Sequence, residues 1–210
     1  MKKITVALLS LLLISGCSSF LPKGSPAPRE YTLNAPMTGG VNLPPLLVSL
    51  QILQPQATPG LEGERIIMRR DDNRIDYISD AKWSGTLNAM MQSLLVESFD
   101  RTHALKAVGN DLVAMNKDYL LLVEIRDFQA EYISGSILPR AHVRLTAKLI
   151  KADENNTVVA THDYEEKENA TSDDLSGIIR AFDSATQNAL QKLVSETVTT
   201  LQVQSKTKIK

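Results

Sequence analysis

Residues 142–150 read HVRLTAKLI, a run in which polar and apolar side chains alternate from His142 to Leu149. Strict alternation is typical of a β-strand that buries one face and exposes the other. The runs at 117–128 and 158–166 have a similar pattern, and the polar stretch KADENN at 151–156 indicates a hairpin turn. The sequence therefore predicts three strands at the centre of the fold, packed on one side and wet on the other.

Further strands are predicted upstream of this centre. Residues 46–53 (LLVSLQIL) alternate in the same way and predict a half-buried strand, with Ser49 and Gln51 on its wet face. Two β-prone runs at 64–70 and 74–78 flank a short Asp/Asn cluster, which indicates a hairpin.

Two segments, 83–99 and 172–201, have apolar residues at helical spacing. Met90 and Met91 in the first could line a lipid groove, but core packing is the commoner use of methionine. Ser172 and the two aspartates after it predict a capped start for the second helix. The order strand, hairpin, helix, three strands, helix predicts an α+β fold: a mostly antiparallel sheet with two amphipathic helices packed on one face.

Residues that could support catalysis or bind a metal are few and scattered. The sequence has no HExxH, no GxSxG and no glycine-rich phosphate loop. His142 and His162 lie on predicted neighbouring strands and could meet, although surface histidines are commoner than a metal pair, and His103 is far from both. Arg69 and Arg70 could bind phosphate, but charge more often blocks aggregation at a strand edge. We therefore expect a protein that is not an enzyme.

The composition excludes two further classes of site. Lys and Arg total 23 against 24 Asp and Glu, and aromatic residues make up 5% of the chain. Such a chain has neither the basic surface nor the stacking residues of a nucleic-acid binder, so we expect no nucleic-acid partner. A single cysteine also excludes an intrachain disulfide and a cysteine metal cluster.

The beginning of the chain is typical of a secretion signal. Two lysines precede an almost wholly apolar run at 4–14, which is shorter than the about 20 residues of a membrane-spanning helix. The sequence ISGC at 14–17 resembles the lipobox of bacterial lipoproteins. In that class the signal, here residues 1–16, is removed, and the cysteine, here Cys17, receives a diacylglycerol and an N-acyl chain. We expect no cofactor other than these acyl chains.

The mature chain is predicted to have three parts. Residues 17–30 are rich in Ser, Pro and Gly and form a flexible tether, 31–203 form the folded domain, and 204–210 form a flexible tail. Ser18 is not an aspartate, which by analogy with enteric lipoproteins favours the outer membrane, facing the periplasm. The tether would hold the domain at that surface.

Four features occur in order along nearly the whole mature chain. They are YTL at 31–33, the proline-led strand at 46–53, RIDY at 74–77 leading into Trp83, and YLLLVEI at 119–125 followed by Phe128 and the closing helix. Their order and spacing resemble those of the ABC-type transport auxiliary lipoprotein family. That family usually continues from its tryptophan with a small residue, Glu, Pro and Leu, whereas this chain has SGTL at 84–87.

The resemblance implies a non-enzymatic subunit of a lipid-transport system, with no catalytic residues. Its partners would be an MCE-domain protein that bridges the periplasm and an associated ABC transporter or permease. The lipoprotein would dock this conduit at the outer membrane, as one copy of a homo-oligomeric ring. Two alternatives remain open: a periplasmic carrier that holds an acyl chain between helix and sheet, and an accessory of outer-membrane protein assembly.

One segment is a candidate partner contact. YISGSILPR at 132–140 places Ile133, Ile137 and Leu138 in an expected loop. Exposed apolar residues in a loop can mark an interface, but they can equally fold back on the core.

Overall fold

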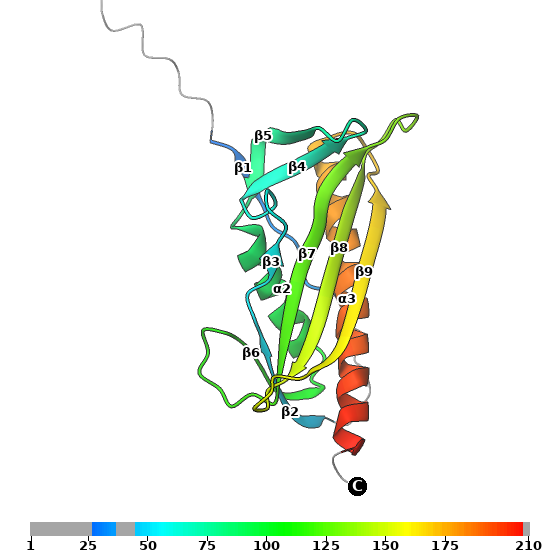
Figure 1. The fold of residues 1–210 in the computed structure, drawn as a ribbon. Coiled ribbons are helices and arrows are strands. Elements are labelled where there is room, and N and C mark those ends of the chain that lie inside the picture. The colour runs from blue at the N-terminus through cyan, green and yellow to red at the C-terminus, as the bar shows by residue number, and fades with distance from the viewer. Residues whose placement is uncertain (1–26, 37–44, 208–210) are drawn as a thin grey trace, which may run out of the picture.

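The structure, a computed structural model, describes residues 27–36 and 45–207 (Figure 1), so Cys17 and the predicted signal lie outside the described residues. These residues form one sheet of nine strands and two helices. The strands are β1 (Arg29–Tyr31), β2 (Leu46–Ile52), β3 (Gln56–Ala57), β4 (Arg65–Arg70), β5 (Ile75–Trp83), β6 (Leu105–Asn110), β7 (Tyr119–Tyr132), β8 (Arg140–Lys151) and β9 (Val158–Asn169); the helices are α2 (Leu87–Asp100) and α3 (Leu175–Thr207).

Strand β7 organises the sheet. One edge pairs with β8 in antiparallel register from Tyr119 to Glu131, and β8 continues to β9 in the same way. The other edge pairs in turn with three shorter strands, all parallel to it: β2, β3 and β4. Beyond these, β6 pairs with β2, β5 pairs with β4, and β1 pairs with β5.

The predicted α+β fold with a mostly antiparallel sheet is confirmed, because the longest pairings, β7–β8 and β8–β9, are antiparallel. Five pairings among the described strands are parallel, which the sequence did not predict. Alternation reveals that a segment is a strand, but it does not say which strand lies beside it.

Both helices cover the same face of the sheet (Figure 1), α3 against β8 and β9, and α2 against β2, β3 and β6. Three fully buried rings join the layers at one point. Phe128 of β7 stacks on Phe182 of α3 at a centroid distance of 5.0 Å, and Trp83 of β5 lies edge-on to them at 5.8 and 5.3 Å. Aromatic pairs in this geometry add to the free energy of burial.

The prediction of a half-buried β2 is wrong. Ser49 and Gln51 on its polar face are each only 6% exposed. Both residues are held by neighbouring segments: the Ser49 backbone amide donates to the Asp118 carboxylate, just before β7, and the Gln51 side chain donates to the carbonyl of Asn110, the last residue of β6. β2 is thus an interior strand, paired with β6 and β7.

Helix α3 begins after Asp174, not at Ser172, and continues to Thr207, past the predicted end at residue 201. The Asp174 carboxylate accepts the Gly177 amide at 2.8 Å, which is the geometry of an N-cap. At about 1.5 Å per residue its 33 residues span about 50 Å. The helix therefore runs the length of the molecule (Figure 1).

The molecule has two ends, which we name by their distance from β1. The proximal end contains β1, the β4–β5 turn, the start of α3 and the tip of the β7–β8 hairpin (Figure 1). The distal end contains the start of β2, the β6–β7 loop, the β8–β9 turn and the end of α3.

Candidate functional site

The hairpin tip, residues 133–139, is a defined turn at the proximal end. The Ile133 carbonyl accepts the Ser136 amide at 3.0 Å, and Gly135 has φ +83°. A positive φ at the third position is the mark of a type II turn and favours glycine. The Pro139 carbonyl, which accepts the Ala170 amide at 2.8 Å, fixes the base of the tip to the end of β9.

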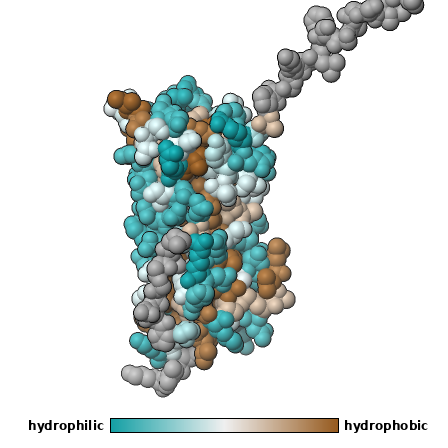
Figure 2. All heavy atoms as spheres, turned by 180° about the vertical axis from the view of Figure 1, so that it is seen from behind, coloured by the Kyte–Doolittle hydropathy of each residue, from teal (hydrophilic) through white to brown (hydrophobic). Residues whose placement is uncertain are grey.

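The three candidate contact residues have different surroundings in this tip. Ile137 is 91% exposed, Ile133 is 36% exposed, and Leu138 is half-buried. The hydroxyl of Tyr132, at the end of β7, donates to Asp173 at 3.1 Å, beside the start of α3. The tip is therefore a supported projection that displays isoleucine to solvent, and Figure 2 shows hydrophobic atoms projecting at this end.

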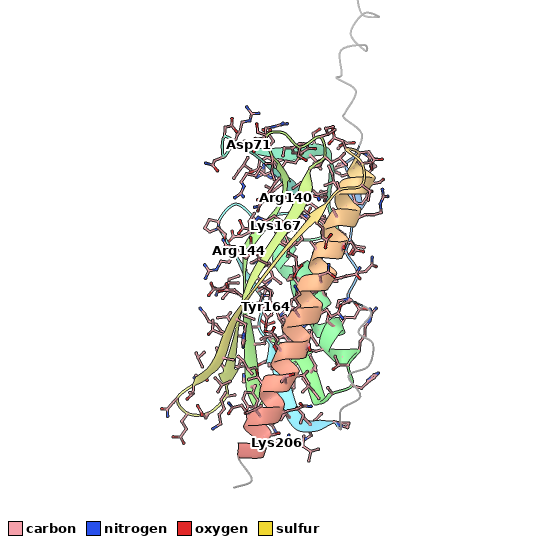
Figure 3. All side chains as sticks on the ribbon, turned by 90° about the vertical axis from the view of Figure 1, so that its right-hand side faces the viewer. Asp71, Arg140, Arg144, Tyr164, Lys167 and Lys206 are labelled. Carbon is pink, nitrogen blue, oxygen red and sulfur yellow. The ribbon has the colours of Figure 1, made fainter. Side chains whose placement is uncertain are left out.

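The outer face of β7, β8 and β9, on the side away from the helices, is covered by charged residues (Figure 3). At its centre, His142 lies between two carboxylates, with Nδ1 2.7 Å from Glu131 Oε1 and Nε2 2.9 Å from Glu165 Oε1. The imidazole ring thus connects a carboxylate of β7 with a carboxylate of β9. Arg69 and Arg140 also pair with Glu131.

The side chain of Glu131 is only 6% exposed, yet it is held as a carboxylate. Burial alone would raise its pKa. Hydrogen bonds from His142 and Arg140, with the charges of His142 and Arg69, outweigh burial and lower the pKa to about 2. This cluster joins β4, β7 and β8 through ionic contacts on the wet side of the sheet.

The sequence did not predict the contact between Glu131 and His142. The two residues are 11 positions apart, on opposite sides of a hairpin whose register was unknown. Placing the turn at 133–139 would have revealed it, since that register sets Gln129 opposite His142 and Glu131 opposite Arg140.

The contact between His142 and His162, which the sequence left open, does not form. His162 is paired across the sheet with Ala147, on the helix side, and its Nδ1 lies 3.5 Å from Glu196 of α3. His142 points to the outer face. Among residues 27–36 and 45–207, no group of three or more His, Cys, Asp and Glu is placed to hold a metal ion.

The arginines at the end of β4 have structural partners, and β4 is not an edge strand. It lies between β5 and β7. Arg69 pairs with Glu131 and lies 3.8 Å from Asp127. Arg70 pairs with Asp76 at 2.7 Å and lies over the Tyr132 ring. The edge-protection interpretation is therefore wrong, and both guanidinium groups are engaged in ion pairs instead.

The distal end also exposes aliphatic residues. Leu47 at the start of β2 and Leu112 in the β6–β7 loop are each 88% exposed, and Val113 is 51% exposed. Figure 2 shows a second group of hydrophobic atoms towards this end. Beside Leu47 lies an open hollow of about 600 Å³, lined also by Lys117, Tyr119, Lys151 and the last turns of α3.

The space between helices and sheet is filled by side chains. Met90 and Met91 are 8% and 0% exposed and belong to the core, as expected of the commoner use of methionine. The stacked Phe128 and Phe182 lie where a carrier would hold an acyl chain. In the part of the chain that the structure describes, no helix is long and apolar enough to cross a membrane.

Residues 31–194 match the model of the family described as "ABC-type transport auxiliary lipoprotein component". The chain belongs to this family. The resemblance found in the sequence is thereby confirmed, and the matched segment extends from β1 into α3.

Two solved structures extend the family comparison. Protein XCC0632 from Xanthomonas campestris is 25% identical, with a TM-score of 0.77 over 84% of this chain and 99% of that chain. The hypothetical protein CT253 from Chlamydia trachomatis is 7% identical, with a TM-score of 0.51 over 73% of this chain and 96% of that chain, and shows the fold alone.

A curated relative differs from this auxiliary lipoprotein in length. The uncharacterized protein bll6063 of Bradyrhizobium diazoefficiens is 26% identical over 187 residues, which are 89% of this chain and 49% of that protein. The chain thus spans about half the length of the curated relative that it matches.

Proposed function

We propose that this auxiliary lipoprotein is held at the outer membrane by acyl chains on Cys17, faces the periplasm, and docks the conduit of an ABC/MCE-type lipid-transport system. Its partners are an MCE-domain protein and the associated ABC transporter or permease, and its copies assemble into a ring. It works by binding, without catalysis and without any cofactor beyond its acyl chains.

The observation that supports this proposal best is the two-ended shape of the domain. The chain enters the sheet at β1, at the proximal end, and exposed aliphatic residues lie at the distal end. Helix α3, about 50 Å long, runs between the two ends. An anchored domain of this shape presents Leu47 and Leu112 to the periplasm. Exposed apolar groups rimmed by polar residues often mark protein–protein contacts.

The anchor is tested by radiolabelled palmitate in the native host. Label should appear on the wild-type chain and be lost from Cys17→Ala, which should move to the soluble periplasmic fraction. A Ser18→Ala variant is the matched control and should keep its label. An unlabelled wild-type chain would contradict the anchor.

The partner is tested by placing a photo-crosslinking amino acid at Leu112 in the full-length chain, with exposed Ile75 of β5, at the proximal end, as the control position. Leu112 should give crosslinked products that contain the MCE-domain protein, and Ile75 should give few. Co-purification of the crosslinked lipoprotein from membranes should also recover the ABC transporter or permease. Recovery of neither component, under conditions that preserve a known complex, would contradict the proposed function.

A further inference from the structure

The hairpin tip displays its isoleucines at the end of the molecule where the chain enters. Ile137 is 91% exposed and Ile133 is 36% exposed, although the surrounding turn is closed by hydrogen bonds. On this supported projection the aliphatic side chains are available for contact with an apolar medium. Water exposure of such groups costs free energy that burial in an apolar medium would recover.

The tip lies at the same end of the molecule as the point where the chain enters the sheet. In the order β1-β5-β4-β7 the strand of the tip is three spacings from β1, about 14 Å across at about 4.8 Å per spacing. Arg29 lies opposite Ala81, six positions along β5 from Ile75, so the tip is also displaced from Arg29 by about 20 Å along the strands. The twelve positions from Cys17 to Arg29 reach about 40 Å when extended, so a membrane surface that holds Cys17 is within reach of the tip when the tether extends.

The size of the tip favours a membrane over a protein partner. A stable protein interface buries about 800 Å² on each side. The tip has seven residues, and only Ile133 and Ile137 among its aliphatic side chains are exposed. Two such side chains on a narrow projection match the requirements of insertion into a lipid surface, where no complementary shape is needed.

The charges beside the tip indicate how it would bind. Arg70 and Arg140 approach it from β4 and β8, but Arg140 pairs with Glu131 and Arg70 with Asp76. Asp71 and Asp72 lie in the same hollow between the tip and the β4–β5 turn. The attraction is therefore apolar, and it should not require anionic lipid.

We propose that Ile133 and Ile137 insert into the interfacial region of the phospholipid bilayer that holds Cys17. The inference rests on the lipid anchor of the proposed function. Two attachments, the acyl chains and the tip, fix the direction of the domain, so the distal end points away from the bilayer.

The test uses the full-length lipidated chain in vesicles of phosphatidylcholine. Because Cys17 is the single cysteine and its sulfur carries lipid, an introduced thiol is labelled alone. Ile137→Cys carries an environment-sensitive fluorophore, and Ser134→Cys provides a second position in the same turn. Leu112→Cys is the matched control, because Leu112 is an exposed aliphatic residue in a distal loop.

Flotation with the vesicles is measured first, since it reports the anchor independently of the tip. In chains that float, the fluorescence emission of both tip labels should shift to the blue and brighten several-fold, and spin-labelled lipid should quench it. The label at position 112 should stay accessible to quenching by aqueous iodide. Tip labels that remain open to iodide would overturn the inference and leave the anchor standing. Chains that fail to float would overturn both.

Protein contact is the remaining outcome to separate. Tip labels that are shielded in native membranes but open to iodide in the protein-free vesicles would overturn the inference in favour of a protein partner.

Discussion

At the scale of single residues, the Glu131 carboxylate is a buried charge with several ionic partners. Its side chain is 6% exposed and is paired with His142, Arg69 and Arg140. Such a group stabilises the fold only as long as it stays ionised, because protonation leaves the guanidinium groups of Arg69 and Arg140 beside a neutral acid.

The pH dependence of stability follows from the pKa of Glu131. Its folded value of about 2 lies below its ordinary value of 4.5, so the stabilisation is complete above about pH 5 and is lost as pH falls towards 2. The shift corresponds to roughly 3 kcal/mol. Chemical denaturation from pH 7 to pH 2 should show this loss.

A Glu131→Gln variant should be less stable than the wild type at pH 7 by about 3 kcal/mol, because its cationic neighbours lose their partner. It should also lose less free energy of unfolding between pH 5 and pH 2. Glu62→Gln, at an exposed position, is the control and should resemble the wild type. If Glu131→Gln and the wild type lost equal amounts of free energy of unfolding between pH 5 and pH 2, this account would be refuted.

Gly177 in the first turn of α3 supports a second residue-scale prediction. Replacing an interior helical glycine by alanine usually stabilises by about 1 kcal/mol. Here a Cβ would lie 2.5 Å from the Ser172 carbonyl oxygen and 2.9 Å from the Ser172 amide nitrogen, and backbone cannot move aside cheaply. Gly177→Ala should therefore destabilise the fold by about 1–3 kcal/mol in chemical denaturation. Ser176→Ala, next to it and exposed, should change little.

At the scale of elements, periodicity was enough to predict some of the structure. β8 was predicted because His142 to Ile150 alternates with almost no exception, and α3 because its apolar residues recur at helical spacing. β6 was missed, since Leu105–Asn110 is short and contains a glycine. The two residues of β3 give no pattern at all.

The sequence could not predict which strands pair or in which register, and the reason is physical. A strand such as β2 has backbone N–H and C=O groups on both edges, and these groups do not differ from one residue type to another. Which strands lie beside it therefore depends on tertiary packing. The ionic cluster of Glu131 depends on that register and stayed hidden with it. The exposed isoleucines of the tip were visible as a candidate, because a short apolar run between two strands is unusual in a turn.

At the scale of the whole molecule, one core joins both helices to the sheet. Trp83, the single tryptophan of the chain, is 1% exposed and contacts rings from β7 and α3. Its fluorescence therefore reports the junction of all layers, whereas far-ultraviolet circular dichroism reports the helices and strands throughout.

We expect the two signals to change together on denaturation, in a single transition with one midpoint. Two separated midpoints would show that the region around β1, β4 and β5 unfolds independently of the long hairpins.

The central position of β7 has a consequence for how the chain acquires its structure. β2, β3 and β4 precede it in the chain, and Leu50 pairs with Tyr119, 69 positions later. Contacts so distant in sequence slow folding. Until residues 119–132 are available for pairing, the earlier strands have unpaired hydrogen-bonding edges that favour aggregation. If the chain is exported as proposed, we expect it to depend on a chaperone that holds it until β7 has emerged.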